Sequence, residues 1–417
     1  MRFSVERDVF ADATGWAARH LPSRPGQAPN ALAGLLLEAD PTSATPGLRV
    51  CAFDTEVAVR APVAADVAEA GRVLVPGRLL ADIVRSLPAA IITVAVEGER
   101  MVLRCGSVRF TVPLMDVADY PELPSFPTPI GEVDTLGFAA AIGQVAPAAA
   151  RDETVPVLTA IRLEISGRGL TLAATDRYRL AVRGISWQPT VEDPWALAHV
   201  SAKVLAEVAR SPTSASRIVV GLDLADPAGA RLGLAAAGRQ TIVRLIEGAF
   251  PNYRKLLPET AAYTLTAATA TLAAAVRRVA VVATRTAPLR FTVSDGQIVA
   301  EAGDGTGAQG REIIPVDYTG PELSVLFNPT YLLDGLSAIE DDESTIGFVD
   351  TDPAQAYARP AVLTGKVPGD PDGRPGGGAF RYLLMPIRTD PQPVPPPSTS
   401  PSSTSPSSTS PSSTSPS

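Results

Sequence analysis

The chain has 417 residues, a formal net charge of −8, two cysteines and two histidines. The acidic balance argues against nucleic-acid binding through bulk charge, although it says nothing about a local basic lining. Two histidines that lie far apart in the chain provide neither a histidine-based metal site nor a histidine-assisted nucleophile.

No segment marks the chain for export or for a membrane. The N-terminus, MRFSVERDVF, has no apolar stretch of signal-peptide length, and no run of about 18 apolar residues occurs. Cys51 and Cys105 lie in apolar or strand-like runs and outside CxxC spacing, which is typical of reduced, buried thiols. We therefore expect a cytoplasmic protein.

Three similar segments divide the chain. Each has a turn glycine followed by an alternating strand pattern: GLRVCAFD from Gly47, GLTLAATD from Gly169 and GQIVAEAG from Gly296, which begin 122 and 127 residues apart. After each comes a segment with helical apolar spacing behind a Pro, Ser or Asn: VPGRLLADIVRS from Val75, VSAKVLAEVARS from Val200 and FNPTYLLDGLSA from Phe327. Apolar helical segments near 8–20, 136–150 and 270–285 open the three units.

The stretches between these helices alternate in apolar and polar residues, as antiparallel hairpins do. The predicted fold is therefore α+β, with three repeated domains of two helices packed on antiparallel sheets. The domains are expected at 1–127, 128–259 and 260–390. Residues 391–417 form a Pro/Ser/Thr repeat with no aliphatic or aromatic residue after Val394, and we expect a disordered tail there.

A catalytic interpretation finds few residues to support it. His20 and His199 lie beside predicted helix ends, where surface or capping roles are expected. GTGAQG at 305–310 matches a dinucleotide-binding glycine pattern, but strand-like REIIPV follows it where a phosphate site needs a helix N-terminus, so a hairpin loop is favoured. EDDES at 340–344 is typical of a solvated turn rather than a cation site. We expect no enzyme, no cofactor and no metal.

Five motifs in order carry a resemblance to a known family. They are MRFSVER, ATDRYRLAVR, FPNYRKLLP, LFNPTYLLDGL and YLLMPIR, and they span the chain from Met1 to Arg388. Together the chain resembles the bacterial DNA sliding clamp, the beta subunit of DNA polymerase III, in its high-GC Gram-positive version. The resemblance implies a head-to-tail homodimer of three-domain protomers, a ring with helices inside and sheets outside that encircles duplex DNA as a processivity factor.

Basic residues recur at equal places in the second helix of two repeats. The resemblance implies that they face inward and attract DNA phosphates without reading bases, whereas a solvated helix face is the plainer alternative. In the third repeat the equivalents are Thr330 and Ser337, so the third domain should grip least. The candidate DNA contacts are Arg78, Arg85, Lys203 and Arg210, with Arg24 of PSRPG as a further loop candidate.

The resemblance also implies a groove that captures short, apolar-ended peptides of the DNA polymerase III alpha subunit, the clamp loader and repair polymerases. Buried Leu and Phe anchors would each contribute about 1.5–3 kcal/mol. Without the resemblance, RYRLAV is typical of a strand with one wet face. The implied groove residues are Leu158, Thr175, Arg177, Tyr178, Arg179, Leu180, Pro251, Lys255, Leu256, Asn328, Tyr331, Pro360, Val362, Leu383, Leu384, Met385, Pro386, Ile387 and Arg388.

Some residues depart from the family pattern. Val155 stands where many relatives carry an arginine, Lys255 is a milder change, and the chain continues past Arg388 where relatives usually stop. One hypothesis is an accessory clamp whose altered groove resists a groove-directed cyclic peptide inhibitor. Another is a clamp-like scaffold that binds peptides but does not enclose DNA, and a third is an unrecognised hydrolase or ligand-binding repeat protein.

The resemblance implies a seam between the two copies. It is expected to join the strand near Phe110 and Val112 in the first domain to the first helix of the third domain near Arg277, Val281 and Val282. An apolar pair on a strand is equally compatible with a place in the core.

Overall fold

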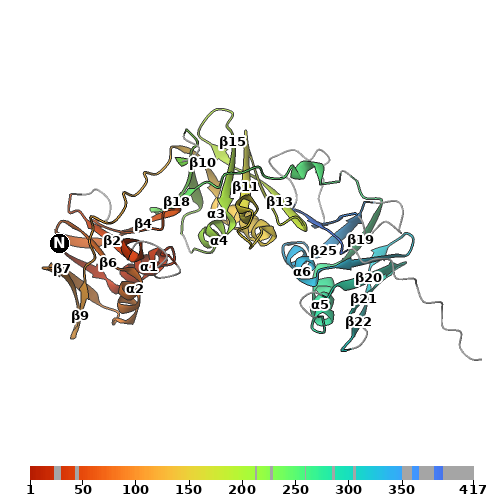
Figure 1. The fold of residues 1–417 in the computed structure, drawn as a ribbon, viewed down its shortest axis with the longest axis horizontal. Helices are drawn as coiled ribbons and strands as arrows, with labels where there is room; N and C mark the ends of the chain where they lie inside the picture. The colour runs from red at the N-terminus through yellow and green to blue at the C-terminus, as the bar shows by residue number, and fades with distance from the viewer. Residues whose placement is uncertain are drawn as a thin grey trace, which may run out of the picture. The chain divides into compact units, whose positions relative to one another are not determined.

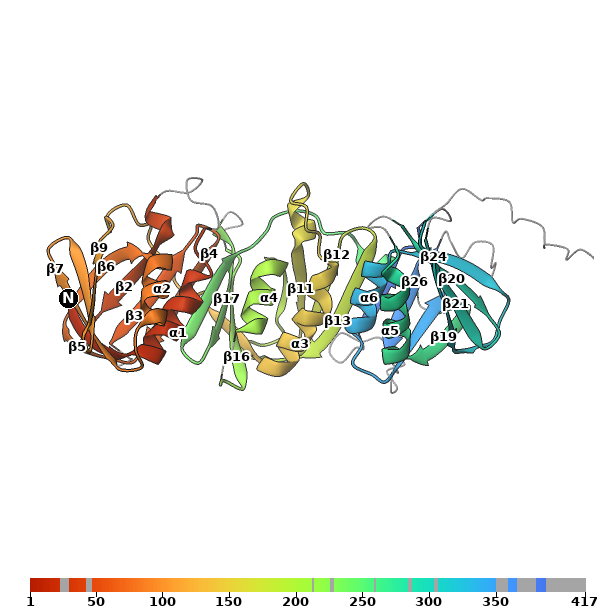
Figure 2. The same cartoon turned by 90° about the horizontal axis from the view of Figure 1, so that it is seen from below.

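The fold was analysed in a computed structural model, which describes residues 1–22, 30–42, 47–211, 214–225, 229–258, 260–283, 287–303, 307–349, 359–365 and 380–387. Three helix pairs recur along the chain, and within each pair the two helices lie side by side (Figure 2). Their bounds are α1 (Arg7–Ala18), α2 (Gly77–Ser86), α3 (Thr135–Val145), α4 (Ala202–Arg210), α5 (Thr269–Ala280) and α6 (Pro329–Ser337). The predicted α+β repeat with two helices in each unit is confirmed.

The described residues of the first repeat form nine strands. Five of them form one antiparallel sheet in the order β5-β1-β7-β8-β9, so β9 is an edge strand. The bounds are β1 (Arg2–Glu6), β2 (Gly34–Ala39), β3 (Leu48–Phe53), β4 (Val57–Val63), β5 (Ala65–Glu69), β6 (Gly71–Pro76), β7 (Ile91–Glu97), β8 (Arg100–Cys105) and β9 (Val108–Pro113).

The second repeat is joined to the first by backbone hydrogen bonding. Strand β18 pairs with β4, from Gln240 opposite Arg60 to Val243 opposite Val57, so one nine-stranded sheet crosses the boundary (Figure 1). The strands of this repeat are β10 (Pro129–Asp134), β11 (Ala160–Ser166), β12 (Gly169–Thr175), β13 (Arg179–Ser186), β14 (Gln188–Pro189), β15 (Trp195–Ser201), β16 (Arg217–Asp223), β17 (Arg231–Ala236) and β18 (Arg239–Arg244).

The third repeat is joined to the second in the same way. Strand β27 lies between β13 of the second repeat and β26 of the third, which makes a second nine-stranded sheet. A four-stranded sheet in the order β22-β21-β20-β24 leaves β22 at an edge. The strands are β19 (Tyr263–Ala268), β20 (Leu289–Ser294), β21 (Gln297–Ala302), β22 (Gly310–Pro315), β23 (Asp317–Tyr318), β24 (Leu323–Phe327), β25 (Glu343–Phe348), β26 (Ala361–Gly365) and β27 (Arg381–Leu384).

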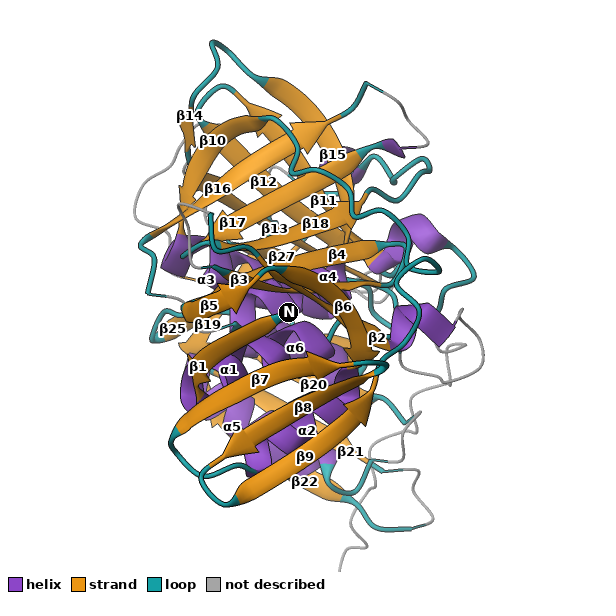
Figure 3. Ribbon diagram, turned by 90° about the vertical axis from the view of Figure 1, so that its left-hand side faces the viewer, coloured by secondary structure: helices purple, strands orange, loops and turns teal. Residues whose placement is uncertain are grey.

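Helix amphipathicity explains how each pair packs. In α2 the side chains of Leu80 and Val84 are fully buried, whereas Arg78, Asp82 and Arg85 are exposed. This is the apolar stripe that the 3.6-residue period of the sequence predicts. The helices lie against the strands (Figure 3), and their apolar stripes and the inward side chains of the sheets share one core.

Several smaller expectations can be compared with the structure. Cys51 and Cys105 are both free and buried, as predicted, and burial raises the pKa of the Cys51 thiol to about 12. The segment after GTGAQG is the strand β22, paired with β21 as a hairpin, although residues 304–306 lie outside the described residues. The acidic residues of EDDES are exposed, as predicted, and its Ser344 is buried in β25.

The surface role expected for the two histidines was wrong for His20, which is buried, and holds only in part for His199, which is half-buried. His20 is 8% exposed and packs edge-to-face on Trp16, and burial lowers its pKa. His199 lies within β15 and stacks on Phe250. Each ring packs against one aromatic neighbour, Trp16 for His20 and Phe250 for His199, which a position beside a helix end does not reveal. Among the described residues no helix is long and apolar enough to cross a membrane.

Two helix glycines predict opposite effects of the same substitution. A Cβ on Gly335 would lie 2.6 Å from the ring of Tyr382, which is buried, so Gly335→Ala should lower the free energy of unfolding by about 1–3 kcal/mol. A Cβ on Gly143 would have no neighbour within 4 Å, so Gly143→Ala should raise it by about 0.5–1 kcal/mol. Urea unfolding of the two variants measures both values. Stabilisation by Gly335→Ala would contradict the close approach of α6 to β27.

Candidate functional site

The turn between β12 and β13 is built by its own polar side chains. The Oδ1 atom of Asp176 accepts hydrogen bonds from the backbone amides of Tyr178 and Arg179, each at 3.0 Å. The hydroxyl of Thr175 donates to the carbonyl of Arg179 at 2.7 Å and accepts from the amide of Arg177. Arg177 has a φ of 79°, in the left-handed region. This geometry exposes the side chains of Arg177 and Tyr178 and buries that of Arg179.

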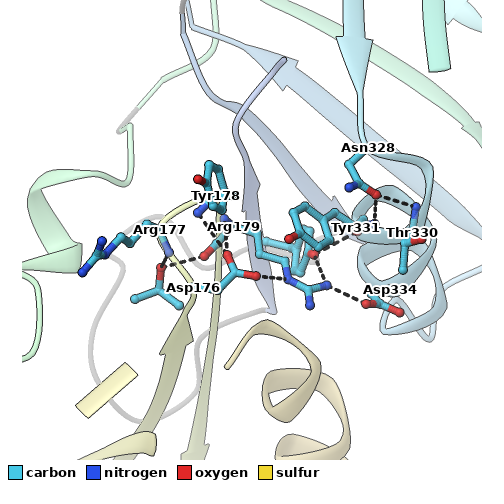
Figure 4. A network of polar contacts seen from close by, with 10 residues as sticks. Asp176, Arg177, Tyr178, Arg179, Asn328, Thr330, Tyr331 and Asp334 are labelled. Carbon is cyan, nitrogen blue, oxygen red and sulfur yellow. Dashed lines mark hydrogen bonds and ion pairs between the residues drawn. The ribbon is translucent and has the colours of Figure 1, made fainter. Parts of the chain in front are cut away.

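Arg179 joins the second repeat to the third. Its Nε donates to Asp176 Oδ2 at 2.9 Å, and its Nη1 donates to Asp334 Oδ2 on α6 at 2.5 Å (Figure 4). Its Cζ lies 4.2 Å from the ring centroid of Tyr331, and the Tyr382 hydroxyl donates to the Tyr331 carbonyl. With 4% of its side chain exposed, Arg179 has its charge neutralised inside the protein.

A cleft of about 550 Å³ opens above this network. One wall comes from residues 149–158 and the turn of the second repeat, and the other comes from the start of α6 in the third. The residues that line it are Ala149, Ala150, Arg151, Asp152, Thr154, Val155, Leu158, Asp176, Arg177, Tyr178, Arg179, Thr330 and Tyr331.

An apolar cluster supports the floor of the cleft. Leu158, Leu180 and Leu383 are buried in it, and Val155 and Met385 pack against it half-buried. Because the cluster combines Leu180 of β13 with Leu383 of β27, the floor forms only when β27 has docked on β13. Apolar side chains of a peptide would extend this cluster.

Two exposed cations flank the cleft. Arg151 and Arg177 make no ion pair with any residue that the structure describes. The acids beside them are already engaged: Asp176 binds Arg179, and the hydroxyl and amide of Thr154 bind Asp152 and lower the pKa of its carboxyl. The cleft therefore offers an apolar floor with a cationic rim.

The structure brings together part of the groove that the sequence predicted. Leu158, Arg177, Tyr178, Arg179 and Tyr331 line the cleft, and Leu180, Leu383 and Met385 support its floor. Asn328 caps α6 through the amides of Thr330 and Tyr331, and Thr175 holds the turn. The predicted residues that neither line the cleft nor support it in these ways are Pro251, Lys255, Leu256, Pro360, Val362, Leu384, Pro386 and Ile387. Arg388 lies outside the described residues.

The cleft also contains residues that the sequence interpretation missed. Ala149, Ala150, Arg151, Asp152 and Thr154 line it directly. The sequence feature that could have indicated them is the charged pair Arg151 and Asp152, which lies between the apolar end of α3 and Val155. Gln144, the one buried polar residue of α3, was also missed, and its Nε2 donates to the carbonyl of Ala338 in the third repeat at 2.9 Å.

Tyr253 and Arg254 of the FPNYRKLLP motif have a structural role. The carboxylate of Glu164 accepts hydrogen bonds from the Tyr253 hydroxyl at 2.8 Å and from Arg162 at 2.7 Å, and it pairs with Arg254. Burial alone raises the pKa of this carboxyl, but these three donors hold it below its ordinary value. The cluster fixes the course of residues 250–255, while Leu256 beyond it remains 51% exposed.

The basic positions of the second helices are exposed, as the sequence interpretation requires. Arg78 and Lys203 are the second residues of α2 and α4, and Arg85 and Arg210 are the ninth. Arg85 lies 3.4 Å from Asp82 in an exposed pair, and Lys203 and Arg210 have no ion pair with a described residue. Arg24 lies outside the described residues.

The expected seam residues divide between surface and core. Phe110 on β9 is half-buried and Val281 is 81% exposed, whereas Val112 is 1% exposed. The assignment of the Val112 side chain to the seam needs correction, because it packs in the core of its own domain and leaves only its backbone at the edge. Val282 is half-buried, and Arg277 lies beside Ser337 of α6.

The comparisons with known proteins agree with this architecture. Residues 1–124, 132–252 and 254–362 match the N-terminal, central and C-terminal domains of the DNA polymerase III beta subunit. The chain belongs to this family. Its function class is accordingly that of a DNA polymerase processivity clamp.

Two curated relatives and one solved structure illustrate the relationship. The chain is 42% identical to the beta sliding clamp of Streptomyces coelicolor over 388 residues, which cover 93% of this chain and 99% of the relative. It is 34% identical to the beta sliding clamp homolog GriR of Streptomyces muensis over 388 residues, which again cover 93% of this chain and 99% of the relative. The DNA polymerase III beta subunit of Thermotoga maritima aligns with a TM-score of 0.80 at 25% identity and covers 93% of this chain and 100% of that one.

The buried ion pair beneath the cleft predicts a stability difference. Asp334→Asn removes a carboxylate from Arg179, which is almost fully buried, and should lower the free energy of unfolding by about 1–3 kcal/mol. Asp82→Asn removes one from the exposed Arg85 and should change it by less than about 0.5 kcal/mol. Guanidinium unfolding of both variants provides the comparison. Equal effects would mean that Asp334 contributes no more than a surface charge.

Proposed function

We propose that the chain pairs with a second copy to form a ring around duplex DNA and that its cleft docks short peptides of the replication and repair machinery. The observation that carries this proposal is the threefold repeat of two packed helices, with exposed basic residues at equal positions of α2 and α4. Such contacts attract phosphates without reading bases, so the ring can slide.

The free strand edges support the pairing of two copies. Strand β9 of the first repeat and strand β22 of the third each lie at the edge of a sheet. Ile313 on β22 is 53% exposed, and the nearby Val281 is 81% exposed. An edge strand with apolar neighbours is suited to pair with another chain, and two different edges on one protomer suit a head-to-tail arrangement.

The cleft supports peptide docking rather than catalysis. Its floor is apolar, and its rim holds Arg151 and Arg177. Leucine or phenylalanine side chains of a peptide would bury themselves on the floor, and the arginines would orient the chain. The partners are the DNA polymerase III alpha subunit, the clamp loader and repair polymerases, and the protein acts in the cytoplasm without catalytic activity of its own.

A second candidate function is that of an accessory clamp with an altered cleft. The observation in its favour is that Val155, where relatives of the sliding clamp often carry an arginine, lines the cleft. Such a clamp would resist a cyclic peptide inhibitor directed at the cleft. The higher identity to the Streptomyces coelicolor clamp than to GriR favours the ordinary clamp.

The ring predicts a dependence on DNA ends. Light scattering at micromolar concentration should give the mass of two chains. After loading by a clamp loader, the protein should remain on nicked circular DNA and leave the same DNA once it is linearised. A monomer, or binding that is indifferent to ends, would favour the peptide-binding scaffold instead.

The cleft predicts where a new charge will block peptides. Val155→Glu places a carboxylate against the apolar floor and should weaken binding of a fluorescent peptide ending in Leu and Phe by tenfold or more, which is about 1.4 kcal/mol. Val191→Glu makes the same change at an exposed loop position of the same repeat and should leave the affinity unchanged. Fluorescence anisotropy measures both. Equal affinities for the two variants would place the peptide site elsewhere.

A further inference from the structure

In each helix pair, an arginine occupies the ninth position of one helix and a small residue occupies the ninth position of the other. In the second helices this position holds Arg85, Arg210 and Ser337, so the third repeat lacks the arginine there. In the first helices the ninth position holds Gly15, Gly143 and Arg277. The third repeat therefore has the arginine on the opposite helix, and a small residue stands where the other two repeats have their arginine.

The contacts show that the two ninth positions face one another. In the first repeat a Cβ placed on Gly15 would lie 3.9 Å from Nη2 of Arg85, so the guanidinium lies over the glycine. In the third repeat Nη2 of Arg277 lies 3.5 Å from Oγ of Ser337. The same place between the paired helices is thus occupied by a guanidinium from α2 in one repeat and from α5 in the other.

The charge of Arg277 remains available. Its side chain is exposed, and it makes no ion pair with a residue in the described part of the chain. The neighbouring Arg278 differs, because its Nε and Nη2 atoms both donate to the carboxylate of Glu312 on β22. Arg277 is therefore left exposed on the helix, whereas Arg278 is paired with the edge strand β22.

We propose that Arg277 binds a phosphate of the enclosed duplex and supplies from α5 the contact that α6 lacks. This inference rests on the proposed function, since it requires DNA at the surface of the helix pairs. It replaces the expectation that the third domain grips least, and it separates Arg277 from the seam between copies. The contact is ionic and independent of base sequence, as for Arg85 and Arg210.

The test compares two exposed arginines that each lie near a serine hydroxyl. Arg290 on β20 is also exposed, and its Nη1 lies 3.3 Å from the Ser324 hydroxyl, but it belongs to a sheet rather than a helix pair. The dissociation constant of each dimeric protein for a fluorescent duplex is measured by anisotropy across a series of NaCl concentrations. Arg277→Ala should weaken binding about threefold and reduce the salt slope by about 0.9 for each protomer contact, whereas Arg290→Ala should change neither.

A double substitution tests the exchange itself. Arg277→Gly combined with Ser337→Arg recreates the arrangement of the first repeat and should restore the affinity and the salt slope. Equal behaviour of Arg277→Ala and Arg290→Ala would overturn the proposal. The proposal would also be overturned if the double variant kept the wild-type unfolding midpoint but did not restore the affinity for duplex. A monomeric mass for Arg277→Ala would overturn it as well, because that result would place Arg277 in the seam. Wild-type protein that neither binds duplex nor stays on circular DNA would count against the proposed function instead.

Discussion

The backbone pairing of β13 with β27 is the interaction on which the cleft depends. Four residue pairs, from Arg179 opposite Leu384 to Val182 opposite Arg381, place β27 against the second repeat. The amide of Met385 then donates to the carbonyl of Tyr178, which ties the residue after β27 to the exposed turn. Leu383 completes the apolar floor from the same strand. Without this ladder the cleft would lose its floor and the fixed relation of its walls.

The side chains around the ladder hold the two walls in register. Arg179 binds Asp176 on one side and Asp334 on the other, and it stacks on Tyr331. Because Arg179 is almost fully buried, breaking either ion pair leaves its guanidinium with one carboxylate partner instead of two. Gln144 adds a second link between the same repeats. A peptide in the cleft would therefore contact two walls whose spacing is fixed by the contacts of Arg179 and Gln144.

The sequence predicted the repeat and its helices well, because both depend on local periodicity. The amphipathic segments VPGRLLADIVRS and VSAKVLAEVARS became α2 and α4, and the alternating segments became hairpins. It did not predict that YLLMP would supply a strand between two repeats. That pairing joins residues about 200 positions apart, and its partner is chosen by the free edges of folded sheets rather than by local pattern.

The site was predicted only in part, for a related reason. A motif indicates which residues gather in one region, but it does not distinguish an arginine that is buried and paired, such as Arg179, from one that is exposed, such as Arg177. Val112 likewise alternates correctly for a strand, yet its side chain faces the core. Arg277 was assigned by its neighbours in sequence, whereas its neighbour in space is Ser337.

The two ladders that cross repeat boundaries also determine how the protein responds to force. Pulling the repeats apart along β4–β18 or β13–β27 would break several backbone hydrogen bonds together, so these boundaries are mechanically stiff. The edges of β9 and β22 have no partner strand within the described chain. In the ring proposed above, tension would open the contact between β9 and β22 of two copies before it broke either ladder.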